Sequence, residues 1–184
     1  MRKIFISNFV SLDGYLAGPG GDLSWHIVTD EFLKYAEDML EQVDTILFGR
    51  LTYEMMAAYW PTEHVKTTDP VIAAKMNSLQ KIVFSRTLDS VDWENSSLMN
   101  DNIENTMRKL KELPGKDMVI LGSGTIVSAF TQMGLIDEYR ILINPVILGD
   151  GKPHFTGIAD RKQLELTDVK RFSSGLVLLT YQPK

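Results

Sequence analysis

Short apolar runs alternate with segments of helical periodicity up to Gly134, and this alternation most constrains the fold. Strands are predicted at residues 3–9, 45–49, 81–85 and 118–121. Between and after these runs, apolar residues recur at helical spacing at 30–42, 50–60, 71–79, 103–113 and 124–133, whereas 63–70 is predicted to be a polar loop. Strands that alternate with helices long enough to cross over form a mostly parallel sheet with helices on both faces.

The pattern changes to strands alone after Gly134. The segments EYRILINPVIL, QLELTDVKRF and LVLLTYQ follow, and the last two are joined by Ser173-Ser174-Gly175, which is typical of a hairpin turn. The sequence therefore predicts one α/β domain over 1–184, with a mixed sheet and a C-terminal antiparallel hairpin. The apolar segment RILINPVIL is expected at an exposed edge, which proteins commonly cover.

Composition excludes several classes of function. The chain has no cysteine, which excludes disulfides, thiolate metal sites and a cysteine nucleophile, and its three histidines are too scattered to suggest a metal site. A net charge of −5 does not favour nucleic acid, and no apolar run approaches the length of a membrane helix. No signal peptide is evident. We expect a cytoplasmic protein with a small-molecule ligand and no metal.

Three predicted strands end in loops suited to phosphate. These loops are Gly49-Arg50-Leu51-Thr52, Ser85-Arg86-Thr87 and Gly122-Ser123-Gly124-Thr125. Carboxyl ends of parallel strands meet at one edge of the sheet, where backbone N–H groups and arginines can bind a ligand with several phosphates. Taken singly, each arginine is more simply a solvated residue and each glycine a turn. The third glycine of a Rossmann fingerprint is replaced by Val127, and no P-loop is present.

Taken together, these segments carry a family resemblance. FGRLTYE, VFSRTL and VILGSGT, in this order, resemble the segments of the dihydrofolate reductase fold that surround NADPH. SLDGYLAG and INPVILGDGKPHF resemble the C-terminal reductase domain of the riboflavin-biosynthesis enzyme RibD. The likeness covers nearly the whole chain and implies a three-layer dihydrofolate reductase-like fold, hydride transfer with NADPH, and a homodimer.

By position, the resemblance implies roles for individual residues in binding the cofactor. Residues of the first loop would lie at the adenine-side phosphates, and those of the second at the ribose 2′-phosphate, where a guanidinium favours NADPH over NADH. Residues of the third loop would lie under the pyrophosphate and nicotinamide, and two residues of the glycine-rich segment would close over the nicotinamide. The residues concerned are Gly49, Arg50 and Thr52; Ser85, Arg86 and Thr87; Gly122, Ser123, Gly124 and Thr125; and Ala17 and Gly18.

The resemblance also implies residues on the substrate side. An acid five residues after a tryptophan binds the pterin in dihydrofolate reductases, and Asp30 follows Trp25 at this spacing. These two are the catalytic candidates, although Asp30 is equally suited to stabilising a helix start capped by Thr29, and Trp25 to anchoring the loop. Tyr53 and Asp13 are further substrate-side candidates, with an Asx turn the simpler role for Asp13.

Two departures from RibD-type reductases affect the substrate. Tyr15 stands where a lysine usually follows LDG, and HIVTDEF replaces an arginine-bearing segment, which argues against a phosphorylated substrate. The cysteine-free chain also lacks the zinc deaminase half of the bifunctional enzyme. The resulting hypothesis is an NADPH-dependent reductase of a pterin-like or amino-pyrimidine ring, similar to 5-amino-6-(5-phosphoribosylamino)uracil reductase. The alternatives are a true dihydrofolate reductase and a nucleotide-binding module without catalysis.

Overall fold

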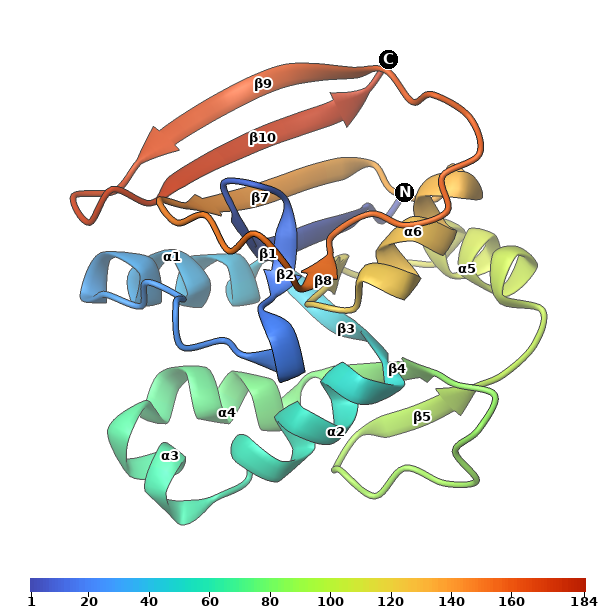
Figure 1. The fold of residues 1–184 in the computed structure, drawn as a ribbon. Helices are drawn as coiled ribbons and strands as arrows, with labels where there is room; N and C mark the ends of the chain where they lie inside the picture. The colour runs from blue at the N-terminus through green and yellow to red at the C-terminus, as the bar shows by residue number, and fades with distance from the viewer.

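A mixed eight-stranded sheet forms the centre of the computed structural model, which describes all residues, 1–184 (Figure 1). The strand order is β5-β4-β3-β6-β1-β7-β10-β9. The first six strands in this order are parallel to one another, and the hairpin of β10 and β9 joins β7 in antiparallel orientation. The strands are β1 Ile4–Ser11, β3 Val43–Gly49, β4 Gln80–Phe84, β5 Ser96–Met99, β6 Asp117–Ile120, β7 Glu138–Asn144, β9 Leu164–Arg171 and β10 Val177–Pro183. A small second sheet pairs β2 (Tyr15–Ala17) with β8 (Lys152–Pro153).

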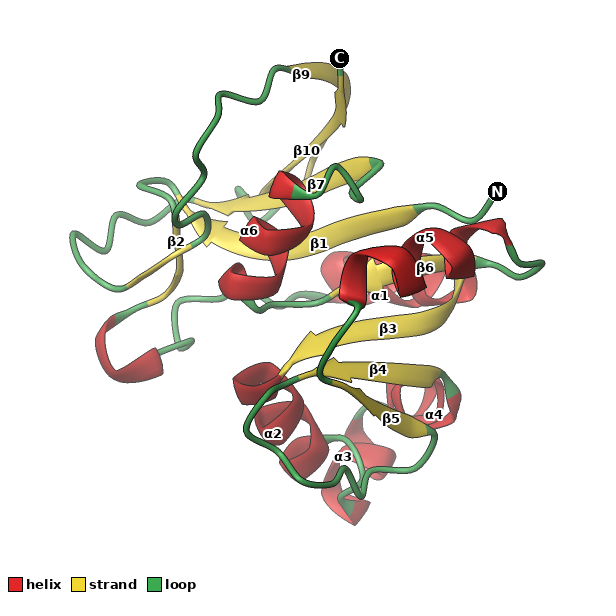
Figure 2. Ribbon diagram, turned by 90° about the vertical axis from the view of Figure 1, so that its right-hand side faces the viewer, coloured by secondary structure: helices red, strands yellow, loops and turns green.

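Helices cover both faces of the sheet, which confirms the three-layer prediction (Figure 2). Residues of α5 (Ile103–Glu112) and α6 (Gly124–Gln132) form one apolar core with alternate residues of the central strands. Residues of α1 (Asp30–Glu41), α2 (Arg50–Tyr59) and α4 (Pro70–Ser78) form the second core on the other face. No helix combines the length and the hydropathy that a membrane crossing requires.

Local sequence signals account for most of these elements. Helix α1 begins where predicted, because the Thr29 hydroxyl accepts a hydrogen bond from the Phe32 N–H. The predicted loop at 63–70 is wrong: it contains α3 (Glu63–Thr68), which Thr62 caps and Val65 anchors in the interior. One buried side chain in six residues leaves no periodicity to detect. The short strand β5 is also missing from the predicted elements, since it is only four residues long.

The predicted edge position of RILINPVIL is also wrong. Strand β7 lies inside the sheet between β1 and β10, and β9 forms the edge instead. The hairpin turns back so that β10 hydrogen-bonds to β7 along five residue pairs, which covers the apolar strand within the same chain. The apolar strand β7 is therefore covered by the hairpin that follows it, and the exposed edge is β9.

The connections of β3 and β6 define where a ligand fits. These strands are neighbours, but α2 leaves β3 toward β4 on one face, whereas α6 leaves β6 toward β7 on the other. Such a reversal opens a crevice at the carboxyl ends of the two strands, and open α/β sheets bind ligands there.

Candidate active site

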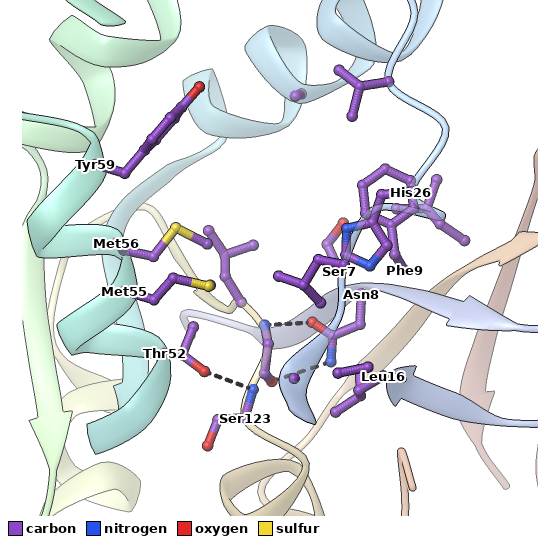
Figure 3. A pocket seen from close by; sticks show the side chains of 18 of the residues that line it. Ser7, Asn8, Phe9, Leu16, His26, Thr52, Met55, Met56, Tyr59 and Ser123 are labelled. Carbon is purple, nitrogen blue, oxygen red and sulfur yellow. Dashed lines mark hydrogen bonds between the residues drawn. The ribbon is translucent and has the colours of Figure 1, made fainter. Parts of the chain in front are cut away.

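A cavity of about 1080 Å³ opens at this edge of the sheet. It extends from the ends of β1 and β6 into the space between α1 and α2, and η1 (Pro19–Gly21) borders it on one side. Figure 3 shows Met55, Met56 and Tyr59 on α2 facing the wall that carries Ser7 and His26. Its volume slightly exceeds the roughly 300–1,000 Å³ typical of single-ligand sites, so a cofactor and a second molecule can share it.

The turn Gly122-Ser123 forms the floor of the cavity. Both residues have positive φ, 66° and 48°, a conformation that costs energy for serine. Asn8 holds the turn: its Oδ1 accepts from the Gly122 N–H at 2.7 Å and its Nδ2 donates to the Gly122 carbonyl at 3.3 Å. Thr52 Oγ1 accepts from the Ser123 N–H at 3.1 Å (Figure 3). Side chains of β1 and α2 therefore fix the backbone of the loop after β6.

Close packing between loops explains three of the predicted glycines. A Cβ at Gly49 would overlap Ser123 Oγ, and one at Gly122 would lie 2.9 Å from Thr52 Cγ2. A Cβ at Gly124 would lie 2.9 Å from the Pro153 carbonyl oxygen. These distances are shorter than van der Waals contact, so no larger residue fits without moving the neighbouring loop.

The two helices that begin at the cavity leave their first N–H groups uncapped. Neither α2 nor α6 has a side-chain cap or an acidic residue in its first turn, whereas α1 has the Thr29 cap and two acids, Asp30 and Glu31. Free N–H groups and the positive end of a helix dipole attract an anion. The start of each helix is thus suited to phosphate. Both starts lie at the cavity, because Thr52 in the first turn of α2 and Ser123 at the N-cap of α6 line its wall.

A buried histidine supports Asn8 from behind. His154 Nε2 lies 3.1 Å from Asn8 Nδ2, and both side chains are buried. Because Asn8 Oδ1 already accepts from Gly122, its amide group donates to His154. Burial lowers the pKa of His154 to about 4, so the ring is neutral at pH 7 and can accept this bond.

Sequence reasoning missed both residues. Asn8 carried a signal, since it is the amide residue in a mostly apolar strand whose other polar residues are two serines. His154 carried none, because its partner is 146 residues away.

Some predicted cofactor residues meet at the cavity. Ala17, Gly18, Thr52, Gly122 and Ser123 line it. Gly49 and Gly124 lie directly behind this lining, in contact with Ser123 and with the β8 backbone. Thr125 is exposed in the first turn of α6.

Arg50 and the predicted loop Ser85-Arg86-Thr87 lie outside the lining of the cavity. Arg50 Nη1 forms an ion pair with Glu54 Oε2 at 3.1 Å on the surface of α2. Ser85 Oγ accepts from the N–H groups of Thr87 and Leu88, both at 3.1 Å, and shapes a turn after β4. Arg86 and Thr87 are exposed on this turn, and Arg86 has no ion-pair partner. A role for Arg86 with the 2′-phosphate stays a prediction.

None of the four predicted substrate-side residues lines the cavity. Trp25 Nε1 donates to the Asp22 carbonyl, and Asp30 is exposed at the start of α1. The Tyr53 hydroxyl accepts from the Trp93 N–H at 3.0 Å, away from the cavity. Asp13 accepts from the N–H groups of Leu148 and Gly149 and thus ties two loops together. A hydrogen bond from Ser11 lowers the pKa of Asp13. Their substrate roles remain predictions without a contact in this structure.

The fold and the position of its cavity define a dihydrofolate reductase-like α/β protein. The family of the RibD C-terminal domain matches residues 2–178, and the chain belongs to this family. Among curated proteins it is similar to the uncharacterized protein YyaP of Bacillus subtilis, with 37% identity over 98% of this chain and 94% of that protein. It is also similar to the uncharacterized protein YwjB of the same organism, with 31% identity over 96% of both chains.

Solved structures share the fold at low sequence identity. A Shewanella sp. PV-4 protein whose name connects it with riboflavin biosynthesis has a TM-score of 0.76, 23% identity, and coverage of 100% of this chain and 99% of that one. A deaminase/5-amino-6-(5-phosphoribosylamino)uracil reductase of Thermotoga maritima gives 0.70 and 18%, over all of this chain and 57% of the other. Dihydrofolate reductase of Enterococcus faecalis, complexed with NADP(H), gives 0.67 and 15%, over 99% and 96%.

Proposed function

We propose that the protein is an NADPH-dependent reductase of a pterin-like or amino-pyrimidine heterocycle. The observation that carries this proposal is the cavity at the reversal between β3 and β6, with its floor held by Asn8 and Thr52. Membership of the RibD C-terminal domain family supports reductase chemistry, and the fold is shared with a reductase complexed with NADP(H). A reductase that draws on NADPH needs the pool inside the cell, so we also propose a cytoplasmic location.

The residues present fit the cofactor. The uncapped starts of α2 and α6 offer N–H groups to the pyrophosphate, and the small residues Ala17 and Gly18 line the cavity where the nicotinamide ring is predicted. Arg86, exposed and unpaired, is the guanidinium assigned to the 2′-phosphate. When bound, NADPH supplies the hydride. The chain itself supplies orientation and a mostly apolar wall.

Binding of NADPH is the direct test. The cofactor should quench the fluorescence of Trp25, Trp60 and Trp93 and raise the melting temperature. Arg86→Ala should weaken NADPH by about tenfold and NADH by much less, because only NADPH has the 2′-phosphate. Arg161→Ala, also exposed, serves as the control. Equal losses for both cofactors would remove the role of Arg86, and no binding of NADPH would end the proposal.

A screen of NADPH oxidation separates the alternatives. Reduction of dihydrofolate would identify a true dihydrofolate reductase. Tight binding without turnover of any pterin or pyrimidine would indicate a nucleotide-binding module. Asp30→Asn tests the predicted acid: unchanged turnover is expected if Asp30, exposed in the structure, only stabilises its helix.

A further inference from the structure

The part of the cavity between α1 and α2 differs from the part near the glycine turn, and we call it the acceptor end. Phe9, Phe32, Tyr35, Met39, Met55 and Met56 define it. Figure 3 shows the Met55 and Met56 side chains extending from α2 toward the space that Ser7 and His26 border. Aromatic rings and polarizable thioethers are suited to the faces of a planar ring.

The acceptor end has no cation. The charged side chains that line the whole cavity are Asp69, Asp150 and Lys152. Lys152 pairs with Ala17 through the small second sheet and so belongs to the glycine-rich end, together with Asp150. Asp69, at the start of α4, adds only negative charge to the other end. None of the seven arginines lines the cavity.

A buried phosphate therefore has no counter-charge at the acceptor end. The cost of removing an anion from water is compensated only by a cation or by several hydrogen bonds to it. Two cations lie near Tyr35, and both are outside the lining. The ammonium of Lys170 lies over the rings of Phe172 and Tyr35, and Arg140 Nε is paired with Glu138 Oε1 at 2.6 Å. The charge of Arg140 is already neutralised by Glu138, and Lys170 does not reach the lining.

Apart from Asp69, the polar groups at the acceptor end are uncharged. Ser7 Oγ and Tyr35 Oη lie 3.1 Å apart and both residues line the cavity. Burial raises the pKa of Tyr35, so its hydroxyl keeps its proton. His26 also lines the cavity, with Nε2 buried and without a hydrogen-bond partner, and burial lowers the pKa of His26 to about 4. Neutral hydroxyls and a neutral imidazole match a carbonyl or ring N–H better than a phosphate.

We infer that the molecule reduced by this protein is an uncharged planar ring with a carbonyl group and no phosphate, whose polar edge meets Ser7, Tyr35 and His26. That the ring is reduced rests on the proposed function, whereas the inference itself concerns which ring the cavity binds. It separates the chain from a reductase whose substrate carries a phosphoribosyl group. It also narrows the predicted pterin-like or amino-pyrimidine class to members without an anionic substituent.

Two matched pairs of probes test the inference by calorimetry, with and without NADP⁺. The first pair is pterin and pterin-6-carboxylate, and the second is menadione and 1,4-naphthoquinone-2-sulfonate. Each pair shares a ring and differs by one negative charge. The neutral member of each pair should bind about tenfold more tightly or better. Equal or tighter binding of the anionic members, or no binding of either neutral ring, would overturn the inference.

Substitutions test whether the preference for neutral rings arises at the acceptor end. Ser7→Ala and Tyr35→Phe should each weaken the neutral rings about three- to tenfold, the range expected for one hydrogen bond. Tyr181→Phe, on β10 and outside the lining, is the matched control. Met55→Lys should tighten the anionic probes, because Met55 is 44% exposed and a lysine there can reach the cavity. A destabilised protein cannot mimic this gain, and its absence would contradict the placement.

The outcomes distinguish the inference from the proposed function. Binding of neutral rings without any binding of NADPH would overturn the proposed reductase function and support the site for an uncharged ring. Binding of NADPH together with a preference for the anionic probes would support the proposed reductase function and overturn the inference of an uncharged ring.

Discussion

Asn8 and His154 show how much one buried polar pair can support. Asn8 makes both hydrogen bonds that hold Gly122, and His154 accepts the remaining amide proton. The arrangement depends on a neutral imidazole, because a protonated ring cannot accept from an amide N–H. The floor of the cavity is therefore coupled to the protonation of a residue on a distant loop.

Protonation of His154 should make stability depend on pH. Its pKa in the folded protein, about 4, lies below the ordinary histidine value of 6.5. The unfolded chain thus binds a proton as pH falls through 6.5 while the folded chain does not, and stability present above 6.5 is lost down to pH 4. Urea unfolding at pH 7 and pH 5 should show a loss of about 2 kcal/mol from this group.

Two variants isolate this contribution from the titration of carboxylates. His154→Gln should lose less stability between pH 7 and pH 5 than the unmodified protein. His64→Gln, at an exposed position on α3, should keep the full pH dependence. The same pH dependence in all three proteins would show that His154 is not buried as a neutral ring.

At the scale of elements, the site is a contact between two loop-to-helix junctions. The junction of β3 and α2 contributes Gly49 and Thr52, and the junction of β6 and α6 contributes Gly122 and Ser123. They meet because β3 and β6 are neighbours while their helices leave to opposite faces. Glycine at these positions allows the backbones to approach.

Substitution of two glycines should separate packing from flexibility. Gly49→Ala should destabilise the fold by about 1–3 kcal/mol, since its Cβ would overlap Ser123 Oγ and displace the turn. Gly18→Ala should change stability by less than about 0.5 kcal/mol, because Gly18 has φ −70° and the nearest atom to a Cβ is 3.4 Å away. Thermal or urea unfolding compares the two. Similar effects would mean that the junctions do not pack as described.

Across the whole molecule, the open edge of the sheet is β9. Seven of its eight residues are exposed, including Leu166 at 49% and Val169 at 47%. Exposed backbone groups along such an edge are a template for pairing with another chain. The homodimer remains a proposal, and we propose that the two chains pair along β9.

Light scattering after gel filtration should give the mass of two chains. Replacing both Leu166 and Val169 by glutamate should shift the protein to one chain, because charge then opposes the burial of this edge. Leu113→Glu, at an exposed position at the end of α5, is the control and should stay dimeric. A single chain at all concentrations would refute pairing, and an unaffected dimer in the double variant would place the interface elsewhere.

Much of the fold follows from local sequence, because periodicity and capping act over a few residues. Thr29 marks the start of α1, Ser173-Ser174-Gly175 marks the hairpin, and the glycine-containing loops mark the ends of β3 and β6. The small residues of these loops also predict a phosphate-bearing ligand, which remains a proposal. The fold and the family could thus be predicted from the amino-acid sequence alone. The same holds for five residues that line the cavity, Ala17, Gly18, Thr52, Gly122 and Ser123.

The walls of the site depend on contacts between distant residues, which no local pattern encodes. Whether Tyr53 faces the cavity or Trp93 depends on how α2 packs on the sheet. Asn8 meets Gly122 across 114 residues and His154 across 146, and only the order of the strands brings them together. Side-chain direction and strand order result from packing the two cores, so they are properties of the folded chain. The absence of cations from the lining of the acceptor end follows from them.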